Sequence, residues 1–183
     1  MSDDDEDRNL PPVDHPAYWD LICTLAELYA DGHIEVDLEA VTGSVQSVGG
    51  NYGPRGIGDL TAMLLARIRL IDDTTPGKDI VTAARERAYT VKFSENRVVD
   101  ITEEPYQLAA VDQVAPVLAD ALDLDRCDGR SIAAFLRSTM DSCPPHHYIA
   151  LVSLAGGMLT RIRRRAAMAV IQPETGRDDS TPD

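Results

Sequence analysis

The sequence has few aromatic residues, few cysteines and no long hydrophobic run. Aromatic residues make up only 5% of the 183-residue chain, although 44% of it is hydrophobic. Leu, Ile, Val and Ala must therefore build the core, which suits packed helices better than a β-sandwich. Cys23, Cys127 and Cys143 have no framework spacing, and we expect them to be reduced thiols in a cytoplasm. The longest apolar run, 149–159, falls short of the roughly 20 residues that a membrane-spanning helix needs.

Lysine is also scarce, and acids exceed bases. Two Lys accompany 15 Arg, a bias typical of a high-GC genome or a salt-adapted proteome, and the net charge is −14. Residues 1–14 hold six acids and one Arg, and residues 173–183 hold four acids and one Arg, so the two ends carry eight of the fourteen excess negative charges. The acidic start, MSDDDEDR, does not resemble a signal peptide. We expect disordered tails at 1–14 and 173–183 around a single helical domain, 15–172, whose modest charge argues against a mimic of DNA.

Apolar residues recur at helical spacing along most of this domain. The clearest stretch begins at Pro16 and is expected to stop at Gly32. The stretch after Asp37, a candidate N-cap, has the same spacing, although its β-branched residues also fit a strand. Further helices are expected at 57–71, from Asp79 onward, and at 102–122, 131–140 and 146–170.

Some local features of these helices can be predicted more sharply. Ser131 is the expected cap of its helix, Pro116 is expected to kink or split the helix that contains it, and Ala166 continues the inward stripe of the last helix. Residues 89–101 fit either a frayed helix end and loop or a small β-hairpin. The sequence therefore predicts an all-α fold, a compact bundle of six or seven helices with short loops.

The stretch VGGNYGPRGIGD, residues 48–59, raises the question of a phosphate-binding loop. A loop of that type needs a Lys after its last glycine, but Asp59 stands there and would repel a phosphate. We instead expect Asp59 to cap the following helix and the glycines to form a tight turn. Arg55, within the same stretch, is a candidate for contact with a partner chain.

A second group of residues could bind a metal ion. Cys127, Asp141, Cys143, His146 and His147 offer thiolate, carboxylate and imidazole ligands. Their spacing is not that of the common zinc sites, and a proline-punctuated helix start with a buried thiol and surface histidines explains them more simply. The adjacent histidines are also candidates for a pH-sensitive contact.

The last predicted helix carries the one clearly basic patch of the sequence. Arg161, Arg163, Arg164 and Arg165 lie in a stretch, 158–172, without any acid. They could contact nucleic-acid phosphates, complement the C-terminal end of the helix dipole, or pair with the acids between Asp112 and Asp128. Gly156 and Gly157, earlier in this helix, favour close packing of another helix.

No arrangement of Ser, Cys and His matches a nucleophilic site, and we expect no cofactor. The leading hypothesis is a non-enzymatic helical interaction protein, a regulatory, accessory or assembly factor of cellular, viral or mobile-element origin. It would bind a protein partner or self-associate, with no membrane contact. The alternatives are a nucleic-acid-binding regulator that uses Arg161–Arg165 and, third, a metal-dependent enzyme.

Overall fold

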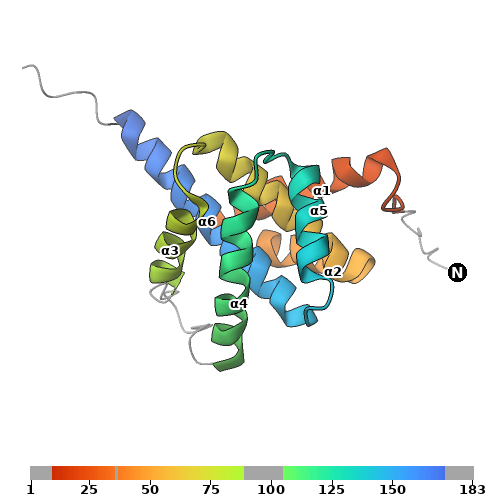
Figure 1. Ribbon diagram of the computed structural model, residues 1–183. Helices are drawn as coiled ribbons and strands as arrows, with labels where there is room; N and C mark the ends of the chain where they lie inside the picture. Colours follow the sequence, from red (N-terminus) through yellow and green to blue (C-terminus); the bar gives the residue numbers. More distant parts are fainter. Residues whose placement is uncertain (1–9, 36, 89–104, 172–183) are drawn as a thin grey trace, which may run out of the picture.

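Six helices and no strand make up the residues that the computed structural model describes, 10–35, 37–88 and 105–171 (Figure 1). The predicted all-α bundle is thereby confirmed. In chain order the helices are α1 (Pro16–Glu35), α2 (Leu38–Ile71), α3 (Gly77–Ala88), α4 (Pro105–Leu122), α5 (Gly129–Met140) and α6 (Pro145–Ile171). In the described ranges, no helix is both long enough and apolar enough to cross a membrane.

Several predictions fall on parts of the chain outside these ranges. They include the alternative hairpin at 89–101, the C-terminal tail and most of the N-terminal tail. Residues 10–14, which we assigned to the tail, are described and contact the helices. The Tyr52 hydroxyl donates a hydrogen bond of 2.9 Å to the carbonyl of Pro11, and Val13 packs against the core.

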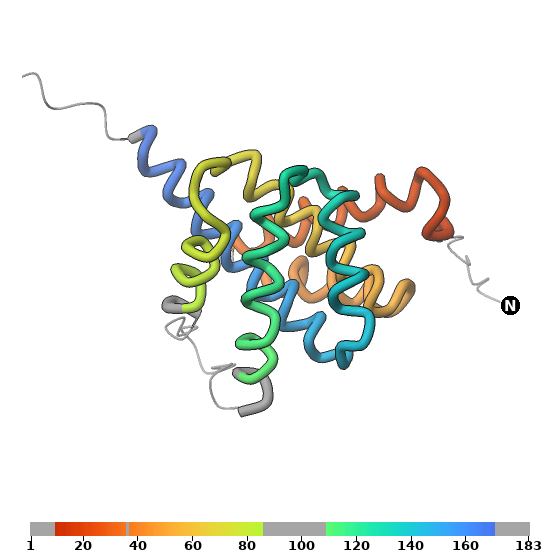
Figure 2. The backbone as a smooth tube through the Cα atoms, in the orientation of Figure 1, coloured from red at the N-terminus to blue at the C-terminus, as the bar shows by residue number. Residues whose placement is uncertain are grey.

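The core lies where α1, α2 and α6 meet, and α4 and α5 cover it. The backbone tube shows α6 running diagonally behind α4 and ending beyond the other helices at the upper left (Figure 2). The Tyr29 hydroxyl on α1 donates a hydrogen bond of 3.0 Å to the carbonyl of Val152 on α6, across 123 positions of sequence. Among the described residues, large side chains that are fully buried come from every helix except α3: Tyr18, Ile22, Tyr29, Leu60, Leu64, Leu65, Ile68, Leu118, Leu122, Ile132, Leu136, Met140, Leu151, Met158 and Leu159.

The glycine-rich stretch forms a kink inside α2. Gly53 adopts φ 61° and ψ −153°, a conformation that favours glycine, and Pro54 then begins the second segment of the helix with its pre-set φ. The predicted turn is therefore present as a kink without a connecting loop. Asp59 is not a cap, because the helix resumes five residues before it. The predicted cap Asp37 is confirmed, since its side chain accepts hydrogen bonds from the backbone of Glu39 and Ala40.

Other local predictions were wrong for identifiable reasons. The helix α1 does not stop at Gly32, which is buried against the first turn of α2, and continues to Glu35. Asp128, and not Ser131, caps α5, and the Ser131 hydroxyl donates a hydrogen bond of 2.7 Å to that carboxylate. Of the two outcomes predicted for Pro116, a split is absent, because α4 continues through this exposed residue.

Candidate functional site

A buried carboxylate lies at the contact of α1, α2 and α5. Asp59 has no solvent exposure, and the Tyr18 hydroxyl donates a hydrogen bond of 2.7 Å to its Oδ2 atom. Arg55 Nε lies 4.0 Å from Oδ2, and Arg137 Nη1 lies 3.9 Å from Oδ1, which has no hydrogen-bond partner among the described residues. Burial raises the pKa of Asp59 above its ordinary value, while Tyr18 and the two arginines lower it.

The same two arginines border a surface pocket of about 390 Å³. We call it the arginine pocket, because Arg55, Arg130 and Arg137 all line it. Arg130 and Arg137 are seven residues apart on α5, a spacing that places both on one face of the helix. Its remaining lining residues come from the N-terminal segment and the first turn of α1: Val13, Asp14, His15, Pro16 and Trp19.

The guanidinium groups of this pocket form few interactions within the chain. The Arg130 guanidinium lies 5.6 Å from the centre of the Trp19 ring, a cation–π distance. Arg55 also lies 4.0 Å from Asp14 at the rim. Among the described residues, none of the three guanidiniums has a hydrogen-bond partner, since contacts of 3.9–4.0 Å exceed hydrogen-bond length. The hydrogen-bonding groups of these three guanidiniums are therefore open to a ligand at the pocket.

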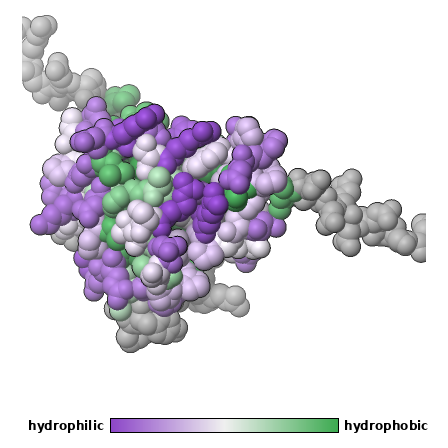
Figure 3. Space-filling model, turned by 45° about the vertical axis from the view of Figure 1, so that its right-hand side comes forward, coloured by the Kyte–Doolittle hydropathy of each residue, from purple (hydrophilic) through white to green (hydrophobic). Residues whose placement is uncertain are grey.

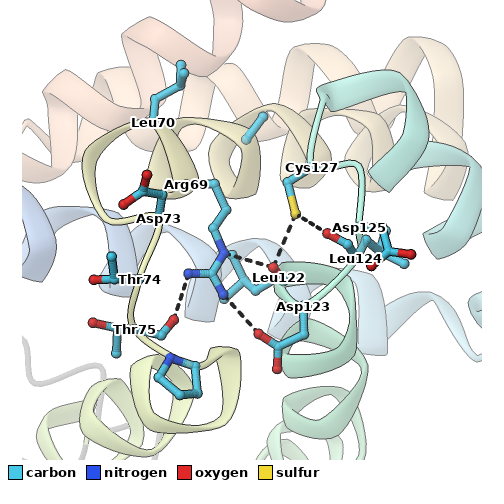
Figure 4. A pocket seen from close by; sticks show the side chains of 12 residues that line it. Arg69, Leu70, Asp73, Thr74, Thr75, Leu122, Asp123, Leu124, Asp125 and Cys127 are labelled. Atoms are coloured by element: carbon cyan, nitrogen blue, oxygen red, sulfur yellow. Dashed lines mark hydrogen bonds and ion pairs between the residues drawn. The ribbon is translucent and has the colours of Figure 1, made fainter.

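A second pocket, of about 540 Å³, shows the opposite arrangement (Figure 4). There the Arg69 guanidinium donates hydrogen bonds to the carbonyls of Leu122, Asp72 and Thr75, at 2.8, 3.1 and 2.6 Å. It also contacts Asp123 at 2.9 Å, so each of its nitrogens is in use. Arg69 joins the ends of α2 and α4, and we assign it a structural role.

The basic patch of α6 divides into engaged and exposed arginines. Arg161 donates a hydrogen bond to the carbonyl of Ala83 on α3, and Arg163 pairs with Asp31, at 3.1 Å, and with Glu27 on α1. Arg164 and Arg165 are exposed, and no ion pair in the described ranges includes them.

Three of the five acids that we considered as partners of this patch pair with other arginines. Within the described ranges, the ion pairs of the acids between Asp112 and Asp128 join Asp112 to Arg85, Asp123 to Arg69 and Asp128 to Arg126. Pairing of the patch with this acidic stretch inside one chain is therefore not observed. The charges that hold α6 are those of α1.

Beyond Arg163, α6 leaves the bundle. Every residue from Arg164 to Val170, which we call the α6 end, is exposed. Met168 is 67% exposed and Val170 84% exposed. In the surface view, hydrophobic atoms are visible at the upper left, where this helix leaves the body (Figure 3). Ala166, which we predicted to face inward, is exposed because the other helices do not extend that far.

The candidate metal ligands are not brought together. Cys127 precedes α5, whereas Asp141, Cys143, His146 and His147 follow it, and the 12 residues of α5 span about 18 Å. The Cys127 thiol donates to the carbonyls of Leu122 and Leu124. In the part of the chain that the structure describes, no three His, Cys, Asp or Glu side chains are placed to hold a metal ion.

The sequence identified only part of the arginine pocket. It singled out Arg55 but not Arg130, Arg137 or Trp19, which the fold brings to the same pocket. A local signal was available in the seven-residue spacing of the two arginines on α5. The contact between α5 and the N-terminal segment arises from the tertiary fold. Neither stretch contains a sequence pattern that predicts it.

Comparison with protein-family models, curated proteins and solved structures finds no match to this chain. Its function is therefore inferred from the chemistry of the arginine pocket and the α6 end.

Proposed function

We propose that the protein binds a partner protein through the α6 end, as an interaction protein. The observation that supports this is the exposure of seven consecutive helical residues, Arg164–Val170, five of which carry apolar side chains. An isolated helical segment of this length is marginal in water, so packing of the preceding turns holds it in place. A helix presented in this way is suited to insertion into a groove on another protein.

The apolar stripe of α6 extends past the bundle. Ile162 is buried, while Ala166 and Val170, four and eight residues further on, lie on the same face of the helix and are exposed. Inside the bundle this face packs against other helices. A partner that covered its continuation would remove the apolar side chains from water, which favours binding.

The charges of the α6 end define the partner further. Arg164 and Arg165 precede Met168 by four and three residues, so the three side chains share one face of the helix. Residues 158–171 contain no acid. The complementary surface is a groove with an apolar floor and carboxylates along its rim.

Nucleic acid is the less favoured partner. Arg161 and Arg163 already interact with α3 and α1, which leaves two arginines for phosphate contacts. Binding through two phosphates would show a salt slope of only about −2. A phosphate backbone is polar and would also stabilise the exposed apolar side chains of Met168 and Val170 very little.

The test is affinity capture of the tagged protein from its native host, at about 50 mM and about 200 mM salt. We expect a stoichiometric protein to be retained at both salt concentrations and lost when Met168→Glu places an acid in the apolar floor. The matched control is Ile149→Glu at the start of the same helix, where Ile149 is 47% exposed. Because both positions are exposed, neither change should unfold the protein, which circular dichroism checks.

Equal retention by Met168→Glu and the wild type would contradict the proposal. Retention of nucleic acid alone, lost at the higher salt concentration, would favour the nucleic-acid alternative.

A further inference from the structure

The arginine pocket has no part in the proposed protein contact, because α6 contributes none of its lining residues. We propose that it is a binding site for a small phosphate monoester, with the phosphate held by Arg55, Arg130 and Arg137. Three features of the pocket support this site: its hydrogen-bond donors, its local charge and its size.

The arginines of the pocket supply the hydrogen-bond donors. A guanidinium offers five N–H groups in a planar fork, a geometry that matches phosphate oxygens. The side chains of Arg55 and Arg137 are 42% and 39% exposed, and their closest contacts with Asp59 are 3.9–4.0 Å. The fully bonded Arg69 shows how this chain uses an arginine for structure alone. The pocket therefore presents three forks whose bonds a ligand can complete.

The local charge is opposite to that of the whole molecule. Three guanidiniums line the pocket, and those of Arg55 and Arg137 lie 3.9–4.0 Å from the buried carboxylate of Asp59. A second acid, Asp14, also lines the pocket and lies 4.0 Å from Arg55. Three positive and two negative charges leave this site with a net charge of +1, in a protein of net charge −14. A phosphate monoester carries about −1.5 to −2 at pH 7, so three arginines attract it more strongly than they attract a single carboxylate.

The size of the pocket leaves room for an organic group attached to the phosphate. Its volume of about 390 Å³ lies in the range of small-molecule sites, about 300–1,000 Å³, and exceeds the need of a bare phosphate. Val13, Pro16 and Trp19 give one side of the pocket an apolar wall. A phosphate attached to a flat or apolar group would contact both the arginines and this wall.

Trp19 provides the measurement, because it is the only tryptophan in the chain. Its fluorescence should change on titration with phenyl phosphate, and calorimetry should give the same affinity. Inorganic phosphate, which has no group for the apolar wall, should bind more weakly. Benzoate, which has the ring and a single negative charge, should also bind more weakly.

The diagnostic variant is Arg130→Gln, because Arg130 is exposed and makes no ion pair among the described residues. Loss of one charge-assisted contact should weaken phenyl phosphate binding about tenfold or more. The matched control is Arg126→Gln, an exposed arginine four residues earlier that does not line the pocket and should leave the affinity unchanged. Unchanged far-UV circular dichroism would verify the fold of both variants.

Three results would overturn the assignment. The first is the absence of any fluorescence or heat change with phenyl phosphate, and the second is equal affinity in the wild type and Arg130→Gln. Benzoate binding as tight as phenyl phosphate would also contradict the match to a dianion. If a phosphotyrosine peptide bound at least tenfold more tightly than phenyl phosphate, the assigned ligand would be a phosphorylated peptide and not a small molecule.

Discussion

Burial of the Asp59 carboxylate is unfavourable in itself, but the carboxylate also orients two arginines. A carboxylate moved out of water is unfavourable unless hydrogen bonds and opposite charges compensate. Here one short hydrogen bond, from Tyr18, and two longer contacts with arginines provide that compensation. The carboxylate in turn keeps the side chains of Arg55 and Arg137 directed toward one place. Its structural role and the arrangement of the arginine pocket are thus linked.

The hydrogen bond between Tyr18 and Asp59 can be tested by Tyr18→Phe. The change leaves a buried carboxylate oxygen without its donor, so we expect the free energy of unfolding to fall by about 2 kcal/mol in urea titrations. Tyr52→Phe is the matched control, because its half-buried hydroxyl bonds only to the carbonyl of Pro11. A smaller loss, about 1 kcal/mol or less, is expected there. Equal losses in the two variants would show that the Asp59 carboxylate is not dependent on Tyr18.

At the scale of elements, the crossing of α1 and α6 depends on a residue without a side chain. A Cβ atom on Gly156 would lie 2.6 Å from Tyr29 Cε1 and 2.8 Å from His33 Nε2. Gly157, its neighbour, faces open space. The first glycine therefore fixes how closely the helices approach, as the sequence predicted. The second only lowers the helix propensity of α6.

These two glycines form a matched pair for mutation to alanine. Gly156→Ala should destabilise the protein by roughly 1–3 kcal/mol, because α1 and α6 must move apart to admit a methyl group. Gly157→Ala should stabilise it by up to about 1 kcal/mol through helix propensity. Thermal and urea unfolding would measure both. A stabilising effect of Gly156→Ala would mean that the two helices separate at little cost.

Local sequence patterns predicted some features of these helices and missed others. Local periodicity located α1 and α6, and local chemistry identified Asp37 as a cap. The role of Asp59 could not be found this way, because its donor Tyr18 is 41 positions away and Arg137 lies on another helix. Ala166 fits the stripe of α6, but the place where the bundle ends depends on the lengths of its neighbours. The arginine pocket was missed because it is assembled from three separate segments.

For the molecule as a whole, two histidines contribute to the response to acid: His147 is buried and His33 is half-buried. Burial lowers the pKa of His33 and of His147 below the ordinary value of 6.5. In the unfolded chain both would take up protons near pH 6.5, while the folded protein resists protonation. The stability that they contribute is therefore present above pH 6.5 and is lost as the pH falls toward their folded pKa values. Asp59 acts in the opposite direction, since its raised pKa favours the folded state as the pH falls through it.

We therefore expect the free energy of unfolding to decrease as the pH falls below about 6.5, by at most about 1.4 kcal/mol per pH unit for each of these two histidines. The double variant His33→Gln, His147→Gln should show a flatter dependence in urea titrations across this range. His15→Gln, with an exposed imidazole, serves as the control. An unchanged slope in the double variant would place the acid sensitivity in other groups.

The contact between α1 and α6 also constrains how the protein is made. Tyr29 bonds to Val152, and Asp31 pairs with Arg163, 132 positions later. At roughly 5–20 residues per second, a ribosome needs roughly 6–25 s to add the 123 residues that separate Tyr29 from Val152. During this time the apolar face of α1 lacks its final cover, although helical proteins generally form from contacts close in sequence. Completion of this fold thus waits for one of its last helices to leave the ribosome.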